Sequence, residues 1–194
     1  MAKSLEGMTN EELWKLFPII IAESNPVWKD NYLTEKTAIV AKIGINNISR
    51  ISHIGSTSAP NLPAKPTIDI LLEIKDDTNL AQLITTIRET GYLYSPQPNN
   101  PPPHMMFMKG YTPEGFKGQA YHLHIRYSGD WDELYFRDYL ISYPDVAKEY
   151  GKLKLKLNEN YEFDRDGYTA AKTDFIKMIT KLAREGMPNK YKPI

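Results

Sequence analysis

The residues of this chain best suited to chemistry lie between His53 and Glu73. The turn Gly55-Ser56-Thr57 interrupts a β-branched run, and a proline-rich loop follows before an apolar run starts at about Thr67. Gly55 has no Cβ and so lets a ligand approach the backbone closely. The Ser56 and Thr57 hydroxyls, together with free N–H groups of the turn, suit a phosphate oxygen. Lys65 adds a point charge of the kind that binds phosphate.

Asp69 stands in the middle of the apolar run Ile68 to Leu72. A carboxylate in a strand otherwise fit for burial is costly unless it is paired or bound to a metal. We therefore predict that Asp69 is a ligand-binding or metal-binding residue. The structural alternative is an ion pair with Lys65 or Arg50.

A second polar group follows on the predicted strand 119–127. His122, His124 and Arg126 alternate with apolar residues there, so their side chains point to one face. Two imidazoles at this spacing could bind one ion or phosphate. The alternative is a solvent-facing polar stripe, as occurs in antiparallel sheets with one open face. His53, beside Gly55, is interpreted equally well as a structural histidine.

The combination resembles a known signature. Gly55-Ser56, twelve residues and then Asp69 resembles the motif of the nucleotidyltransferase superfamily, which has a polymerase-beta-like fold. The longer strings from His53 to Pro60 and from Ala64 to Ile70 resemble more specifically the GrpB family, an uncharacterised bacterial family placed in that superfamily. Its domain also occurs fused to dephospho-CoA kinase. Later segments agree over about residues 17–185, and these are Tyr121 to His124, Phe136 to Leu140, Pro144, Tyr168, Lys172 and Phe175-Ile176.

The resemblance implies roles for particular residues. The turn would hold the phosphates of a nucleotide, and Asp69 would bind Mg²⁺ or Mn²⁺. The expected catalytic residues are Asp69, Ser56 and Lys65. The expected phosphate-binding residues are Gly55, Ser56, Thr57, Lys65, Arg126 and Lys172, and the expected metal ligands are Asp69, His122, His124 and Glu73.

One position departs from the superfamily pattern. Its second carboxylate belongs two residues after Asp69, where this chain has Leu71. Glu73 shares the face of Asp69 but lies roughly 7 Å further along the strand, whereas paired catalytic ions sit about 3.5–4 Å apart. The sequence therefore fits one ordinary metal ligand, and a two-metal site only if distant residues complete it.

Composition limits the classes of function. The chain of 194 residues has 24 basic and 24 acidic side chains, 41% hydrophobic residues and no cysteine. The balance of charge argues against a nucleic-acid or membrane partner, and the lack of cysteine excludes disulfides and thiol chemistry. No apolar run reaches membrane-spanning length and no signal-like segment begins the sequence, so we expect a cytoplasmic protein.

Patterning predicts a single domain over 1–194, with a sheet part at about 17–127 and helices at about 131–186. Predicted strands cover 17–22, 46–54, from 67, 92–94, 105–109 and 119–127, with a long hairpin loop at 110–118 and a surface loop at 95–103. Predicted helices cover 9–16, 27–44, 131–142, 143–159 and 165–186, with another that is capped by residues 76–78 and runs to about 90.

These observations predict an α/β (α+β) fold, a nucleotidyltransferase-like mixed sheet with a C-terminal helical part. The leading hypothesis is a metal-dependent transfer of a nucleotidyl group from a nucleoside triphosphate to a small-molecule acceptor. The alternative is a non-catalytic nucleotide- or CoA-related binding module whose metal site is degenerate at Leu71. The substrate, the acceptor and the oligomeric state do not follow from the sequence.

Overall fold

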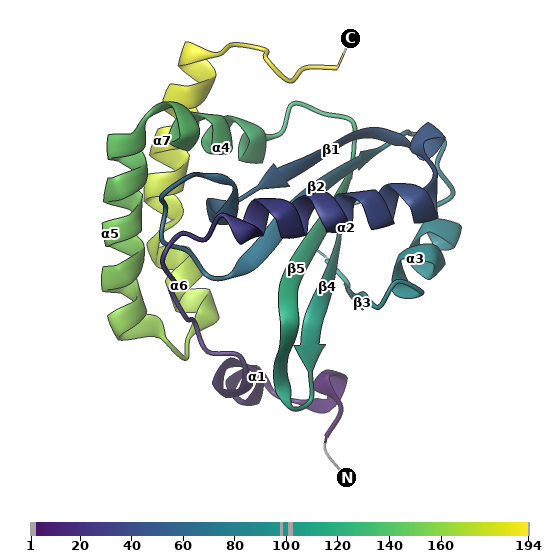
Figure 1. Cartoon of the computed structure of the whole chain (residues 1–194), viewed down its shortest axis with the longest axis horizontal. Helices are drawn as coiled ribbons and strands as arrows, with labels where there is room; N and C mark the ends of the chain where they lie inside the picture. Colours follow the sequence, from purple (N-terminus) through teal and green to yellow (C-terminus); the bar gives the residue numbers. More distant parts are fainter. Residues whose placement is uncertain (1–2, 98, 101–102, 194) are drawn as a thin grey trace.

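The protein is built on one five-stranded mixed sheet. Its computed structural model describes residues 3–97, 99–100 and 103–193, and the strand order is β1-β2-β5-β4-β3 (Figure 1). Only β2 and β5 pair in parallel; the other neighbours are antiparallel. The strands are β1 (Ile48–Ile54), β2 (Thr67–Ile74), β3 (Leu93–Ser95), β4 (Met105–Thr112) and β5 (Gly115–Tyr127).

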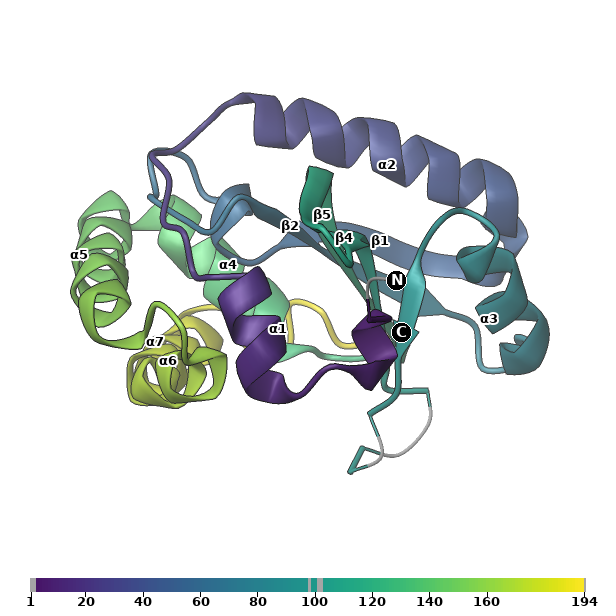
Figure 2. The same cartoon turned by 90° about the horizontal axis from the view of Figure 1, so that it is seen from below.

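Helices lie on both faces of this sheet. In Figure 2, α2 runs along one face, while α4 to α7 gather on the opposite side. This arrangement confirms the predicted mixed α/β class. The α-helices are α1 (Asn10–Leu16), α2 (Val27–Ile43), α3 (Leu80–Arg88), α4 (Asp132–Ser142), α5 (Pro144–Tyr161), α6 (Arg165–Ala171) and α7 (Thr173–Gly186), and short 3₁₀ turns occupy Leu5–Gly7, Ile45–Asn47 and Ser56–Ser58.

Alternation along β2 separates the core from the site. Ile68, Ile70 and Leu72 are fully buried in the main core, which also contains α2 and α3 side chains such as Trp28 and Ile87. Asp69, Leu71 and Glu73 point to the other face, because successive strand residues face opposite sides. The face opposite the main core therefore carries the polar residues of β2.

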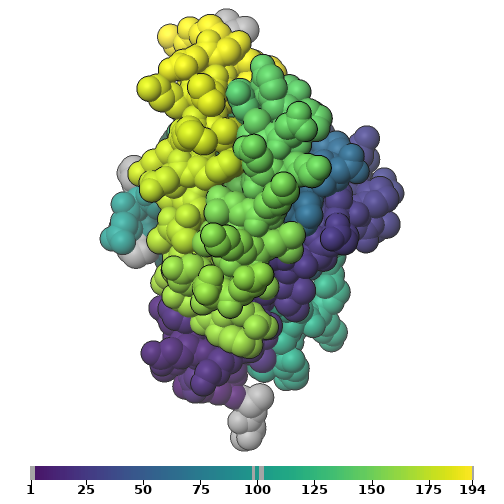
Figure 3. Space-filling view, turned by 90° about the vertical axis from the view of Figure 1, so that its left-hand side faces the viewer, coloured from purple at the N-terminus to yellow at the C-terminus, as the bar shows by residue number. Residues whose placement is uncertain are grey.

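The parallel register of β2 and β5 extends that polar face. Asp69 is paired with His122, Leu71 with His124 and Glu73 with Arg126. Partners in register share a face, so the two predicted polar groups lie side by side. The C-terminal helices then cover part of this face, and Figure 3 shows the outer surface that α5 to α7 form.

The predicted strand at 17–22 is wrong. The structure contains only an isolated bridge there, between Ala22 and Ala64. The Ile19 amide instead donates to the Glu162 carbonyl at 2.8 Å. The backbone of this segment bonds to Ala64, in the loop before β2, and to Glu162, at the end of α5, so these hydrogen bonds hold it outside the sheet.

The predicted hairpin loop at 110–118 is also wrong. β4 and β5 continue through it, and Thr112 pairs with Gly115 across a tight turn. A bulge after Lys109 accommodates Gly110, whose φ is +88° and where a Cβ would lie 2.6 Å from the Gln119 carbonyl oxygen. Glycine here marks an irregularity within a strand, and the sequence pattern alone does not separate that from a loop.

Other predicted elements need smaller changes. The helix at 165–186 is two helices, because Lys172 (φ −95°, ψ −5°) ends α6 and precedes α7. Asn79, and not residues 76–78, caps α3 by accepting from the Gln82 amide. The capping box between Thr9 and Glu12 is confirmed. The loop at 95–103 lies partly outside the described residues. None of the helices seen in the described ranges has the length and apolarity that a membrane span requires.

Leu71 belongs to a small apolar cluster that couples β2 to α4. It is completely buried against Ile54 and Leu134, with Trp131 and Tyr191 packed around them. The position two residues after Asp69 is therefore occupied by a buried apolar side chain and offers no metal ligand. Helix α4 holds its place on the polar face through this contact.

We expect Leu71→Asp to destabilise the protein by more than about 3 kcal/mol, because it buries an unpaired carboxylate in place of an apolar side chain. Leu71→Met is the matched control and should cost less than about 1.5 kcal/mol. Urea unfolding followed by circular dichroism measures both. A stable Leu71→Asp variant would show that this position can hold a carboxylate after all.

Candidate metal and phosphate site

The centre of the site is a cluster of one carboxylate and two imidazoles. The Asp69 Oδ1 lies 3.2 Å from His122 Nδ1 and 3.6 Å from His124 Nε2. Ligand atoms of the three residues all lie within 4.8 Å of one another, a spacing that suits one metal ion. Their side chains are 13–28% exposed, so an ion can enter from solvent.

Hydrogen bonds set the charge of this cluster. Burial raises the pKa of Asp69, but hydrogen bonds from His122 and His124 outweigh burial and hold that pKa well below its ordinary value. Burial lowers the pKa of His122, and Asp69 opposes this shift. Asp69 therefore remains a carboxylate, the form that binds a cation.

Tyr111 orients His122 through the ring nitrogen that faces away from Asp69. The Tyr111 hydroxyl lies 2.8 Å from His122 Nε2, so the other ring nitrogen, Nδ1, faces Asp69. Metal-binding histidines commonly use their second nitrogen in this way, which fixes the ring and its tautomer. Tyr111 is buried and stands outside the predicted site residues.

Gly55 lies directly against Asp69. A Cβ at Gly55 would collide with the Asp69 carboxylate, and the φ of +68° is one that other residues rarely adopt. The lack of a side chain at Gly55 therefore makes room for the Asp69 carboxylate, and not only for a ligand. Register explains the proximity, because Ile54 pairs with Asp69 at the end of β1.

Lysine side chains surround a buried tyrosine next to this cluster. Lys172 Nζ lies 5.0 Å and Lys65 Nζ 5.8 Å from the centre of the Tyr168 ring. Tyr168 is 1% exposed, and its hydroxyl has no hydrogen-bond partner among the described residues. Burial, together with the neighbouring Lys172 and Arg165 charges, lowers the pKa of Lys65 to about 8 against the attraction of Asp69.

Lys154 joins the same group from α5. Its side chain is buried, its Nζ donates to the Pro63 carbonyl, and it lies 4.8 Å from the Tyr150 ring centre. Burial, with the Lys172 and Lys65 charges, lowers its pKa to about 7. We call Lys65, Lys154, Lys172 and Arg165 the cationic group. In the part of the chain that the structure describes, none of its members forms an ion pair.

Several predicted residues have other contacts. Glu73 is fully buried and accepts from Arg50 Nη2 at 2.7 Å and from the Gly129 amide at 3.0 Å, and it is not part of the metal-ligand cluster. Arg126 lies 3.5 Å from Glu133 and over the Trp131 ring. The structure therefore separates Glu73 and Arg126 from the roles expected for them.

The turn residues divide in a similar way. Thr57 is buried, and its hydroxyl donates to the Thr67 carbonyl and contacts His53 Nε2 at 3.0 Å, so it is engaged within the protein. Burial lowers the pKa of His53 to about 4, and its ring stacks on Tyr32. Burial raises the pKa of Tyr150, and a hydrogen bond with the Ser56 hydroxyl opposes this rise. Ser56 therefore lies beside the tyrosine that Lys154 contacts.

The chain matches the GrpB protein family over residues 18–182. The chain belongs to the GrpB family. A GrpB-family relative from Pseudomonas aeruginosa, a UPF0157 protein, is 33% identical over 163 residues, which are 83% of this chain and 66% of the relative. A second relative, YqkA of Bacillus subtilis, is 31% identical, and the chain covers only 46% of its length.

A solved structure agrees with the family. The crystal structure of the conserved protein GrpB from Enterococcus faecalis superposes with a TM-score of 0.75 at 30% identity, covering 86% of this chain and 98% of that one. A Cid1 poly(U) polymerase structure matches at a TM-score of 0.48 and 11% identity, over 78% of this chain and 45% of that one. That second likeness is too weak to indicate a shared activity.

Substitution of Glu73 should separate stability from metal binding. We expect Glu73→Gln to lower the free energy of unfolding by about 3 kcal/mol, because Arg50 loses its buried partner. Affinity for Mn²⁺, measured by calorimetry on the folded protein, should stay at the wild-type value. Glu133→Gln, at a half-exposed carboxylate, should change stability by less than about 1 kcal/mol. A loss of Mn²⁺ affinity in Glu73→Gln that matched His124→Ala would instead make Glu73 a ligand.

Lys154 should make stability depend on pH. The pKa of Lys154 is 10.5 in the unfolded chain and about 7 in the folded protein. Between these pH values the unfolded chain binds more protons than the folded protein, so stability rises with pH. From pH 7 to pH 9 its contribution to the free energy of unfolding is about 2 kcal/mol.

The slope of unfolding free energy against pH over that range should therefore be smaller in Lys154→Met than in wild type. Lys152→Met is the matched control, because Lys152 lies on the same helix and is exposed, and it should keep the wild-type slope. Urea titrations at each pH give the slopes. Equal slopes in Lys154→Met and wild type would show that Lys154 keeps its charge in the folded protein up to pH 9.

Proposed function

We propose that this protein binds a nucleoside triphosphate together with one divalent ion and transfers its nucleotidyl group to a small acceptor. The observation that carries the proposal is the meeting of a metal-ligand cluster with an unpaired cationic group. Cations gathered without acidic partners are costly, and an anionic ligand compensates that cost. A nucleotide would satisfy both halves of the site, because the cationic group would hold its phosphates and Asp69, His122 and His124 would hold its divalent ion.

The donor set fits an ion that accepts imidazole. Asp69 offers oxygen, and His122 and His124 offer nitrogen. Magnesium prefers oxygen ligands in a strict octahedron, whereas imidazole binds transition ions. Of the expected ions, Mn²⁺ therefore fits better than Mg²⁺. When bound, such an ion polarises a phosphoryl oxygen and orients the substrate.

The chain's own residues would do the rest by electrostatics. In nucleotidyl transfer the acceptor hydroxyl gives its proton to solvent water and its oxygen bonds to the α-phosphorus. The bond from that phosphorus to the bridging oxygen breaks, and pyrophosphate leaves with the electron pair. Lys65, Lys172 and Lys154 would neutralise the charge that builds on the departing pyrophosphate. Ser56, beside Tyr150, would hold a further phosphate oxygen.

The alternative is a binding module without transfer, and Leu71 favours it. A buried leucine occupies the place of the second carboxylate, and Glu73 is held by Arg50, so only one carboxylate faces the site among the described residues. Release of pyrophosphate from a nucleotide in the presence of candidate acceptors separates the two functions. The binding step is common to both.

The binding step is tested by thermal unfolding with ATP, GTP, CTP or UTP, each with Mn²⁺ or with a chelator. Binding to the native state raises the melting temperature by mass action, and at 100-fold excess over Kd the rise should be about 5 °C or more. It should require Mn²⁺ and should vanish in Asp69→Asn. Asp77→Asn, at an exposed carboxylate, should keep the full shift.

Shifts are compared within each variant, since Asp69→Asn also removes a negative charge from beside the lysines. Equal Mn²⁺-dependent shifts in Asp69→Asn and wild type would rule out the proposed metal site. A shift that needs no metal would leave the cationic group as an anion site and remove the ion from the proposal.

A further inference from the structure

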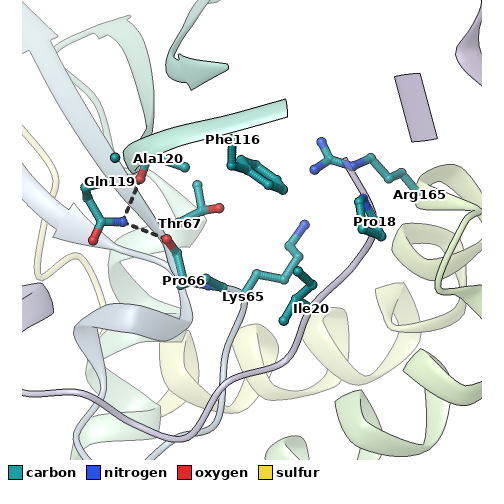
Figure 4. A pocket seen from close by; sticks show the side chains of 10 residues that line it. Pro18, Ile20, Lys65, Pro66, Thr67, Phe116, Gln119, Ala120 and Arg165 are labelled. Atoms are coloured by element: carbon teal, nitrogen blue, oxygen red, sulfur yellow. Dashed lines mark hydrogen bonds between the residues drawn. The ribbon is translucent and has the colours of Figure 1, made fainter. Parts of the chain in front are cut away.

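A cavity lined in part by Lys65 and Arg165 opens beside the cationic group. It encloses about 260 Å³ and extends between residues 18–20, the start of β2, the β4–β5 hairpin and α6. Figure 4 shows the Lys65 amino group and the Arg165 guanidinium pointing into it, with Phe116 between hairpin and cavity. Pockets that enclose drug-sized ligands measure about 300–1,000 Å³, so this one suits one small planar group rather than a whole drug-sized molecule.

The walls of the cavity are mainly apolar. Phe116, Pro18 and Ile20 contribute side chains to it, and Phe116 is 41% and Ile20 51% exposed. Large apolar side chains exposed together around a hollow are typical of binding sites. The Gln119 amide is already engaged, because its nitrogen donates to the Pro66 and Ala120 carbonyls and its oxygen accepts from Asn31.

The Phe116 ring is held in place. It packs at 5.1 Å from the Phe17 ring and 5.2 Å from the Tyr111 ring, so it offers a prepared flat surface. Arg165 is held against the same aromatic residues. Its guanidinium lies 5.8 Å from the centre of the Tyr111 ring and donates to the Phe17 carbonyl at 3.1 Å. Aromatic rings and guanidinium planes are the groups on which proteins stack nucleobases.

The cavity is connected to the metal-ligand cluster. Tyr111 contacts Phe116 and Arg165 on one side and hydrogen-bonds His122 on the other. Lys65 lines the cavity and also lies against Tyr168 in the cationic group. Lys65 and Arg165 are therefore shared by the cationic group and the cavity wall, which places the two side by side.

We propose that this cavity is the subsite for the planar base of the nucleotide whose phosphates occupy the cationic group. This inference rests on the proposed function and specifies its substrate. An alkyl chain would satisfy Phe116 and Ile20 but would bury Lys65 and Arg165 without acceptors. A nucleobase brings ring faces for Phe116 and Arg165, and acceptor atoms at its edge for Lys65.

The test compares two probes that share the triphosphate and differ in the base. The Kd values of ATP and of inorganic tripolyphosphate are measured by calorimetry with Mn²⁺ on the full chain. We expect ATP to bind wild type at least tenfold more tightly than tripolyphosphate. Phe116→Ala, which removes the stacking surface, should weaken ATP by roughly tenfold, as stacking of one base contributes, and leave tripolyphosphate unchanged.

Ile20→Trp is the second variant, because it fills the cavity from an exposed position and leaves the Phe116 packing intact. It should weaken ATP by at least as much as Phe116→Ala does. Leu93→Ala is the matched control, since Leu93 is also 41% exposed but lies on the edge strand β3 away from the cavity. It should leave both affinities unchanged.

Three results would overturn the subsite. They are equal affinity of wild type for the two probes, an unchanged ratio of affinities in both variants, or an equal loss of both probes in Ile20→Trp, which would place phosphate in the cavity. Failure of the proposed function looks different. In that case Asp69→Asn binds both probes as wild type does, whatever happens at Phe116.

Discussion

The parallel pairing of β2 with β5 is the constraint on which the candidate site depends. It sets Asp69 directly opposite His122 and two residue pairs from His124, on the face that the main core does not use. A shift of one residue would turn Asp69 into the apolar core and Ile70 toward the lysines. The buried isoleucines and leucines of the opposite face therefore fix the position of the carboxylate as firmly as any polar contact does.

Electrostatics around this face is uneven. Two buried acids away from the site, Glu35 and Glu73, have close basic partners in Lys109 and Arg50. Among the described residues, Asp69 is the one acid that acts on Lys65 and Lys172. Burial lowers the pKa of all three lysines, and repulsion from neighbouring cations contributes for Lys65 and Lys154. The protein thus compensates charge where it is structural and leaves positive charge uncompensated beside the metal-ligand cluster. An anionic ligand would remove this imbalance.

Short-range patterns in the sequence predicted much of the sheet and the centre of the site. The interrupted apolar run identified β2 and Asp69, and the alternation at 121–126 identified His122 and His124 as neighbours on one face. The pairing of those strands is a long-range contact, so their convergence on one point could not be read from either segment. Glu73 shared the required face, yet the pattern could not show that Arg50 would hold it.

The residues that sequence reasoning missed come from ambiguous segments. Lys154 lies in the run Lys152 to Leu157, where lysine and leucine alternate and the helix pattern appears only over a longer window. Lys154 is buried, whereas Lys152 and Lys156 are exposed. This difference depends on what the helix packs against. Arg165 and Tyr111 similarly acquire their roles through packing against residues 17–20, a segment whose apolar pattern predicted a strand.

The position of that segment has a consequence for the order of folding. Residues 17–22 are bound on one side by Ala64 and on the other by Glu162 and Arg165, and the cationic group draws Lys154, Arg165 and Lys172 from the same late stretch of the chain. During synthesis, which proceeds from the N-terminus, the sheet can pair as soon as β5 has emerged. The cationic group cannot be complete until Lys172, directly after α6, has been synthesised. The sheet can therefore form on the nascent chain before the cationic group is assembled.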